Sequence, residues 1–180
     1  MRRARALAGS ALFLVVAPGC VGGLVPWWVT RWRVEHALPL PLRAAGALLL
    51  AAGAAVLLPA FWRFAVEGLG TPAPVAPTAR LVVGGIYAHV RNPMYLAVTS
   101  AVTGQALLLG STTLALYGAV ALACMVAFVR LYEEPALRRR YGAEYDAYCR
   151  TVPRWWPRLT WPSSRDHGSQ PPAPPPSGEA

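Results

Sequence analysis

Five polar or aromatic side chains lie within nine residues near the middle of an otherwise apolar chain. They are Tyr87, His89, Arg91, Asn92 and Tyr95. Together they offer ring faces, hydrogen-bond donors and a fixed positive charge. A set of this kind, placed where a loop enters an apolar helix, can hold a polar cofactor against a lipid-soluble substrate.

The residues around this cluster predict a loop that ends in a helix. Gly84 and Gly85 come just before it, and glycine allows a turn and the close approach of another molecule to the backbone. Pro93 follows the cluster, and proline is well suited to the first turn of a helix because it has no N–H to lose there. We therefore expect an ordered loop that leads into a helix at residue 93.

A second polar cluster, made of Arg130, Glu133 and Glu134, ends the last long apolar run. Arg130 and Glu133 are three residues apart, so an α-helix places them on one face. At a membrane boundary such groups can simply extend to water. If they face inward, each charge costs about 2.5–3.5 kcal/mol and requires a partner or a function. We favour a function because the two clusters are expected to meet.

The composition indicates a membrane protein. Of the 180 residues, 55% are hydrophobic and 14% are charged, against about 25% charged in an average soluble domain. The net charge is +9, and all 17 basic residues are arginines. These arginines flank apolar runs, which suits lipid headgroups better than nucleic acid.

The apolar runs predict an all-α polytopic membrane protein with about four transmembrane helices. The first run ends near Val29 and is too long for a signal-peptide core. The others span about 42–64, 93–109 and 112–131. Only Gly110 and Ser111 separate the last two, so these should form an antiparallel hairpin with both polar clusters at one end.

Charge asymmetry predicts the orientation. With four spans and both termini inside, 14 arginines lie on the inner side and 3 on the outer side. The positive-inside rule then places the termini and the loop of residues 67–91 in the cytoplasm, and the setting expected is a bacterial inner membrane.

The chain divides into three expected parts. Residues 1–66 form an N-terminal transmembrane helix pair, and residues 67–162 form the core with the loop, the hairpin and a C-terminal helix. That helix places Leu137, Tyr141, Tyr145 and Tyr148 on one face, as in a helix that lies in the membrane interface. Residues 163–180 are rich in Ser, Gly and Pro and should be disordered.

Paired motifs in residues 67–157 resemble the isoprenylcysteine carboxyl methyltransferase and phospholipid methyltransferase superfamily of membrane enzymes. The first motif runs from Gly85 to Tyr95, and the second is Glu133-Glu134 followed by residues 141–148 and Val152-Pro153. The resemblance implies an S-adenosylmethionine-dependent methyltransferase. It acts on a lipophilic acceptor, which stays open between a carboxylate, a phospholipid amine and a thiol.

The resemblance also implies roles for particular residues. Glu133 hydrogen-bonds the cofactor, and Arg130 orients the acceptor, so these two are the expected catalytic residues. The implied cofactor-binding set is Ala79, Arg80, Leu81, Val82, Tyr87, Arg91, Asn92, Pro93, Met94, Tyr95, Glu133 and Glu134. Methyl transfer from a sulfonium is a displacement that depends on positioning and needs no metal. The three cysteines have no metal-ligand spacing either.

Two other functions are compatible with parts of the sequence. A non-catalytic membrane protein could dock lipid or a partner through its basic cytoplasmic face, which includes Arg138, Arg139 and Arg140. A transporter is disfavoured because no predicted span contains a charge near its middle. The expected partners are therefore the membrane and a lipophilic acceptor, without nucleic acid and with an open oligomeric state.

Overall fold

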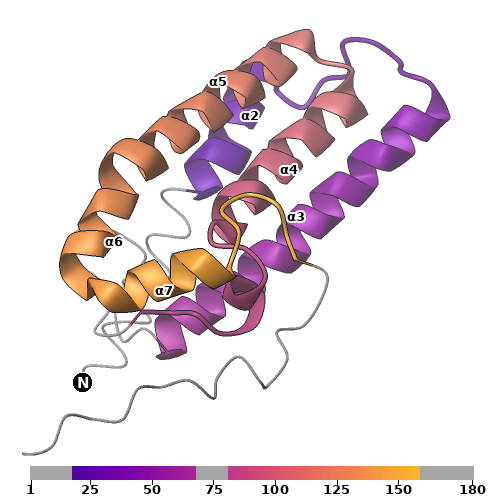
Figure 1. Ribbon diagram of the computed structural model, residues 1–180. Coiled ribbons are helices and arrows are strands. Elements are labelled where there is room, and N and C mark those ends of the chain that lie inside the picture. Colours follow the sequence, from indigo (N-terminus) through magenta and orange to yellow (C-terminus); the bar gives the residue numbers. More distant parts are fainter. Residues whose placement is uncertain (1–17, 68–80, 159–180) are drawn as a thin grey trace, which may run out of the picture.

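The computed structural model describes residues 18–67 and 81–158, and every regular element in these ranges is helical (Figure 1). In chain order they are η1 (Cys20–Leu24), α2 (Val25–Thr30), α3 (Leu40–Glu67), η2 (Gly85–Ala88), α4 (Pro93–Leu109), α5 (Thr112–Phe128), η3 (Val129–Glu133), α6 (Glu134–Tyr141) and α7 (Ala143–Thr151). The all-α class is confirmed. The first residues, the loop of residues 68–80 and the predicted tail from 163 lie outside the described residues.

Within the part of the chain that the structure describes, two stretches are long and apolar enough to cross a membrane, namely Leu40–Ala60 and Thr112–Tyr141. In the most apolar 18 residues of each stretch, only 11% are buried inside the protein, whereas the core helix of a soluble protein is mostly buried. Leu48, Leu58 and Leu116 are each more than 60% exposed, which favours a hydrocarbon surrounding. The apolar helices Cys20–Thr30 and Pro93–Leu109 are shorter, so four crossings remain a prediction.

Helices α3 and α4 pack side by side through glycines (Figure 1). A Cβ atom added to Gly46 lies 2.8 Å from the backbone oxygen of Gly104, and one added to Gly53 lies 2.6 Å from that of Ala97. No side chain fits at these distances. Small residues that bring two backbones together are typical of helix contacts in membranes.

The predicted hairpin is present, and α4 has the predicted bounds. Gly110 ends α4 in a left-handed conformation with φ 60°, and Ser111 accepts a hydrogen bond from the Leu114 N–H at the start of α5. The connection before α3 covers this turn, since the Glu35 N–H donates to the Leu109 carbonyl over 2.8 Å. This connection and the start of α4 therefore lie at opposite ends of the helix.

The C-terminal helix predicted up to Arg150 is instead two helices, α6 and α7. Gly142 separates them with φ 51° and ψ −125°, a conformation that residues with a Cβ rarely adopt. The predicted apolar face folds into a small core, in which Tyr145, Tyr148 and Val152 are buried against Leu81 and other side chains. Much of this face is thus covered by protein.

Candidate functional site

The loop before α4 is ordered from residue 81 onward. Gly85 adopts φ 59°, which allows the tight turn into η2. Tyr87 and Val82 are buried together against Ala60 of α3, with Met94 packed beside them. Burial also raises the pKa of the Tyr87 hydroxyl well above its usual range. The loop is therefore fixed to the helix bundle.

The boundary between loop and helix is at Asn92, as predicted, because Pro93 is the first residue of α4. The Asn92 side chain does not cap the helix. Its amide Nδ2 instead donates to the backbone oxygen of Arg154 over 3.1 Å. Asn92 and Pro93 are both buried, so this residue ties the start of α4 to the C-terminal segment.

One hydrogen bond joins the two polar clusters. The Tyr95 hydroxyl, in the first turn of α4, donates to Glu133 Oε2 over 2.8 Å. Glu133 ends η3, the π-helical turn that extends α5, and π-helical turns are frequent at functional sites. The predicted meeting of residues 38 positions apart in the chain is confirmed.

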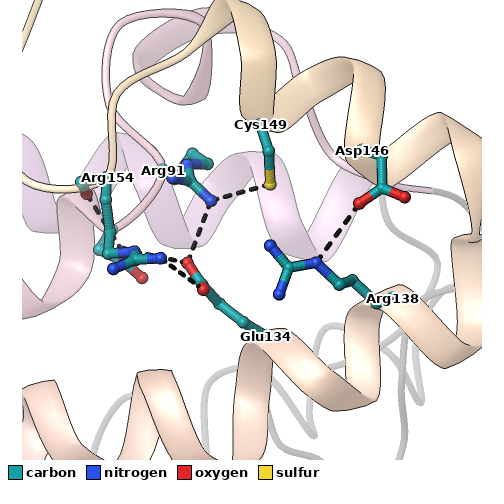
Figure 2. Close-up of polar contacts among 7 residues, drawn as sticks. Arg91, Glu134, Arg138, Asp146, Cys149 and Arg154 are labelled. Carbon is teal, nitrogen blue, oxygen red and sulfur yellow. Dashed lines mark hydrogen bonds and ion pairs between the residues drawn. The ribbon is translucent and has the colours of Figure 1, made fainter.

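Glu134, the second member of the acidic pair, lies between two arginines (Figure 2). Arg91 Nη1 donates to Glu134 Oε1 over 3.0 Å. Arg154 donates through Nε and Nη2 to the two carboxylate oxygens, each over 2.7 Å. The Glu134 side chain is only 5% exposed. This forked pairing is the geometry that best offsets the cost of burying a carboxylate.

Residues 152–158, here called the strap, cross over the loop. The Arg91 N–H donates to the Pro153 carbonyl over 3.0 Å, and the Arg158 N–H donates to the His89 carbonyl over 2.9 Å. Before the strap, the Tyr148 hydroxyl of α7 donates to the Tyr87 carbonyl over 2.7 Å. Burial raises the pKa of this hydroxyl, so it stays protonated and donates.

Arg154 is a site residue that the sequence analysis missed. It lies 20 residues beyond Glu134 and outside any helix. Helical periodicity therefore gives no signal for its contact with the acidic pair. The only pointer was Val152-Pro153, which precedes it in the motif of the resemblance.

Arg130 is placed differently from the expectation. It is exposed in η3, whereas Glu133 is half-buried. A π-helical turn is wider than an α-helical turn, so a spacing of three no longer puts both side chains on one face. Among the described residues, no hydrogen bond or ion pair joins Arg130 to Tyr95 or Glu133. Its role toward an acceptor remains a prediction.

The remaining predicted residues are Ala79, Arg80 and Leu81. Leu81 is half-buried against Tyr145 and Tyr148. Ala79 and Arg80 lie outside the described residues. The described part of the chain holds no group of three His, Cys, Asp or Glu side chains that could bind a metal ion.

The site has unused hydrogen-bonding capacity. Among the residues that the structure describes, the buried donors Arg91 Nε and Trp155 Nε1 have no acceptor. Glu133 uses Oε2 for Tyr95, which leaves Oε1 as an acceptor. Buried polar atoms of this kind cost about 1–3 kcal/mol when they stay unpaired. Together these atoms can bind a ligand that carries both an amino or hydroxyl group and an oxygen acceptor.

The chain matches a known protein family. Residues 42–144 match the family model described as phospholipid methyltransferase, and this range is more than half of the chain. It begins in α3 and includes the loop, the hairpin, the acidic pair and the start of α7. No curated protein and no solved structure shows a significant match to the chain.

Proposed function

We propose that this chain transfers a methyl group from S-adenosylmethionine to a lipid amine. The chain belongs to the phospholipid methyltransferase family and is a membrane methyltransferase. The observation that carries the proposal is the Tyr95–Glu133 hydrogen bond, because it joins the two motifs at one end of an apolar helix hairpin. The family description favours a phospholipid headgroup over a prenylated carboxylate or a small thiol as the acceptor.

The residues present suit S-adenosylmethionine. This cofactor carries an amino group, ribose hydroxyls and a carboxylate. Glu133 Oε1 can accept from the amino group or the hydroxyls, and Arg91 Nε can donate to the carboxylate. The cofactor supplies an electrophilic methyl group on a sulfonium. Tyr95 lies beside Glu133, so its ring is available for a cation–π contact with that charge.

The protein contributes position and exclusion of water. Arg91 is held from its side chain by Glu134 and from its backbone by Pro153, so its free Nε points in a fixed direction. Pro93 and Asn92 are buried, and Met94 packs against the loop. A rigid and largely dry site favours a displacement reaction, because the reacting groups are already aligned.

An amine acceptor must lose a proton when it becomes methylated, so the site needs a proton acceptor. Glu133 is the carboxylate that suits this step, because Oε1, which Tyr95 does not use, has two lone pairs, one for the cofactor and one for the proton of the amine. Glu134 is unsuited because both of its oxygens are paired with arginines. We therefore assign Glu133 to the reacting groups and Glu134 to positioning Arg91.

The proposed setting follows from the surface of the helices. The exposed apolar side chains of α3 and α5 let a lipid reach the site from the bilayer. We place the site at the cytoplasmic side of a bacterial inner membrane, where S-adenosylmethionine is present. The arginine asymmetry of the sequence supports this orientation.

The first prediction concerns Tyr95 and Glu133, here called the central pair. In the full-length protein purified in detergent, Glu133→Gln should weaken S-adenosylhomocysteine binding about tenfold, since hydrogen bonds to a charged group are worth about 1.5–3 kcal/mol. It should also abolish methyl transfer to phosphatidylethanolamine, because the proton acceptor is lost. Tyr95→Phe should reduce the affinity for S-adenosylhomocysteine and the rate of methyl transfer, each by a smaller factor. Calorimetry measures binding, and methyl-labelled cofactor measures transfer.

Two exposed residues provide matched controls. Glu144→Gln on α7 and Tyr132→Phe in η3 make the same chemical changes on exposed side chains, and both should leave binding and transfer unchanged. If the unsubstituted protein binds no S-adenosylhomocysteine, the proposal is wrong. Lipid docking through the exposed arginines of α6 then becomes the better function. A labelled product that is an ester or a thioether would correct the acceptor.

A further inference from the structure

The strap does more than close the chain over the loop, because it brings an aromatic side chain to the central pair. The Trp155 ring meets the Tyr95 ring edge to face, with ring centroids 6.5 Å apart and planes at 60°. Tyr95 in turn donates to Glu133. Tyr95 thus lies between Trp155 and the Glu133 carboxylate, which we assign to the reacting groups.

Contacts on both sides of Trp155 hold its ring in place. The strap residue before it, Arg154, is anchored by its side chain to Glu134 (Figure 2). Its backbone oxygen also accepts from the Asn92 side chain. On the other side, Arg158 donates its backbone N–H to His89. Contacts at both ends therefore hold Trp155 in place beside α4.

The indole N–H of Trp155 is buried, yet it has no acceptor among the residues that the structure describes. Tryptophan N–H groups usually find a partner when they are buried. The next residue, Trp156, shows the contrast, since it is 83% exposed. A buried N–H beside the central pair, without an acceptor among these residues, is suited to donate to an acceptor on a ligand.

We propose that Trp155 is a ligand-binding residue of this site, whose indole N–H donates to an oxygen of the bound molecule. This inference rests on the proposed function. The oxygen belongs either to the cofactor, as a carboxylate or ribose oxygen, or to the phosphate of the lipid acceptor. Trp155 lies beyond residues 42–144, so the family match does not assign it.

The test compares two adjacent tryptophans. Trp155→Phe keeps a ring against Tyr95 and removes the N–H, and Trp156→Phe makes the same change on an exposed side chain. In the full chain, Trp155→Phe should weaken the binding of S-adenosylhomocysteine, or of the lipid, about five- to tenfold. Trp156→Phe should weaken either less than twofold. A weaker affinity for S-adenosylhomocysteine identifies the cofactor as the source of the oxygen. A higher KM for phosphatidylethanolamine with unchanged cofactor affinity identifies the lipid.

The outcomes separate this inference from the function on which it rests. If the unsubstituted protein binds cofactor and methylates lipid, but Trp155→Phe and Trp156→Phe behave alike in both assays, Trp155 is not a ligand-binding residue. If the unsubstituted protein binds no cofactor and methylates no lipid, the proposed function fails, and this inference fails with it.

A measurement on the unsubstituted protein keeps the inference testable if Trp155→Phe does not fold. Trypsin cleaves after Arg154 and Arg158, which flank Trp155, and after Arg33, which is exposed at the other end of α4. Saturating S-adenosylhomocysteine or lipid should slow cleavage in the strap at least threefold and leave the Arg33 site unchanged. If neither ligand changes the strap cleavage relative to Arg33, the inference is wrong.

Discussion

At the scale of single residues, the carboxylate of Glu134 is the point where three parts of the chain meet. It accepts from Arg91 in the loop and from Arg154 in the strap. A buried carboxylate is tolerated only when its charge is paired and its lone pairs are used. The pairing therefore holds the strap on the loop, and with it the position of Trp155.

We predict that Arg154→Ala lowers the free energy of unfolding by about 2–3 kcal/mol. It removes two charge-assisted hydrogen bonds and leaves Glu134 with Arg91 alone. Because Arg154 is itself partly exposed, the loss should be at the lower end of the range for buried pairs. Thermal unfolding of the detergent-solubilised protein measures it, together with faster tryptic cleavage after Arg158.

Two further variants interpret that result. Arg150→Ala removes an exposed arginine of α7 and should change the free energy of unfolding by less than about 0.5 kcal/mol. Arg154→Lys keeps the charge but cannot make the fork to both oxygens, so it should restore only part of the stability. Equal effects of Arg154→Ala and Arg150→Ala would show that the Glu134 pair does not stabilise the strap.

The sequence predicted one half of the site at this scale. Tyr95 and Glu133 were expected to meet because each lies at the same end of a hairpin, and a hairpin follows from a two-residue connector. Arg154 and Trp155 were not predicted. They reach the site through hydrogen bonds of an irregular segment, such as the Arg91 N–H to Pro153, and such bonds have no period in the sequence.

At the scale of elements, the π-helical turn η3 determines which partners the two acidic side chains contact. Pro135, at the start of α6, has no N–H to donate to the preceding turn. Local widening of the helix re-satisfies the carbonyls that proline leaves without a donor. Glu133 and Glu134 consequently face different partners, Tyr95 for the first and two arginines for the second.

Helix packing gives a prediction for α3 and α4. Gly53→Ala places a Cβ atom 2.6 Å from the backbone oxygen of Ala97, so the two backbones must separate. Overpacking of this kind costs about 1–3 kcal/mol, and the midpoint of thermal unfolding in detergent should fall accordingly. Cofactor affinity should fall too, because α4 carries Tyr95 and begins directly after Asn92.

Gly23 is the matched control for that substitution. It also lies in a helical turn, but a Cβ atom added there meets nothing within 4 Å. Gly23→Ala should leave the unfolding midpoint unchanged or raise it slightly, since alanine has less conformational freedom in the unfolded chain. If both alanine variants unfold at the same temperature, the close approach of α3 to α4 does not limit stability.

Element boundaries were predictable where one residue determines the backbone. Pro93 begins α4 and Gly110 ends it, as expected from proline at a first turn and glycine after a last turn. The break at Gly142 was missed. Charged and apolar residues keep a helical period across it, so the pattern favours one helix. Gly142 ends α6 with a positive φ, and Tyr145 and Tyr148 of α7 pack on the loop.

At the scale of the whole molecule, the apolar side chains point outward and the paired charges gather at one end. Leu116 and Val120 on α5 are more than half exposed, and the Glu134 network lies at the end where α6 and α7 fold across the bundle (Figure 1). Composition predicted the outward apolar side chains, and the apolar runs with their two-residue connector predicted that the polar clusters lie at one end. Under the proposed function, a lipid acceptor would approach laterally and the water-soluble donor would approach from the polar end.

This arrangement predicts that the two ends of α4 lie on opposite sides of the membrane. Its 17 residues span about 25 Å, close to the hydrocarbon thickness of about 30 Å. Val34 is exposed in the connection beside the far end of α4, and Glu144 is exposed on α7 beside the site. With Val34→Cys and Glu144→Cys, a membrane-impermeant maleimide should label the first only in right-side-out vesicles and the second only in inverted vesicles.

The unsubstituted protein measures the background of that experiment. Its Cys124 is exposed on the apolar helix α5, so lipid should shield it from the water-soluble reagent in both kinds of vesicle, and detergent should make it reactive. Labelling of both introduced cysteines from the same side would contradict the crossing of α4. Labelling from opposite sides, with Glu144→Cys on the cytoplasmic face, would place the Tyr95–Glu133 pair where S-adenosylmethionine is available.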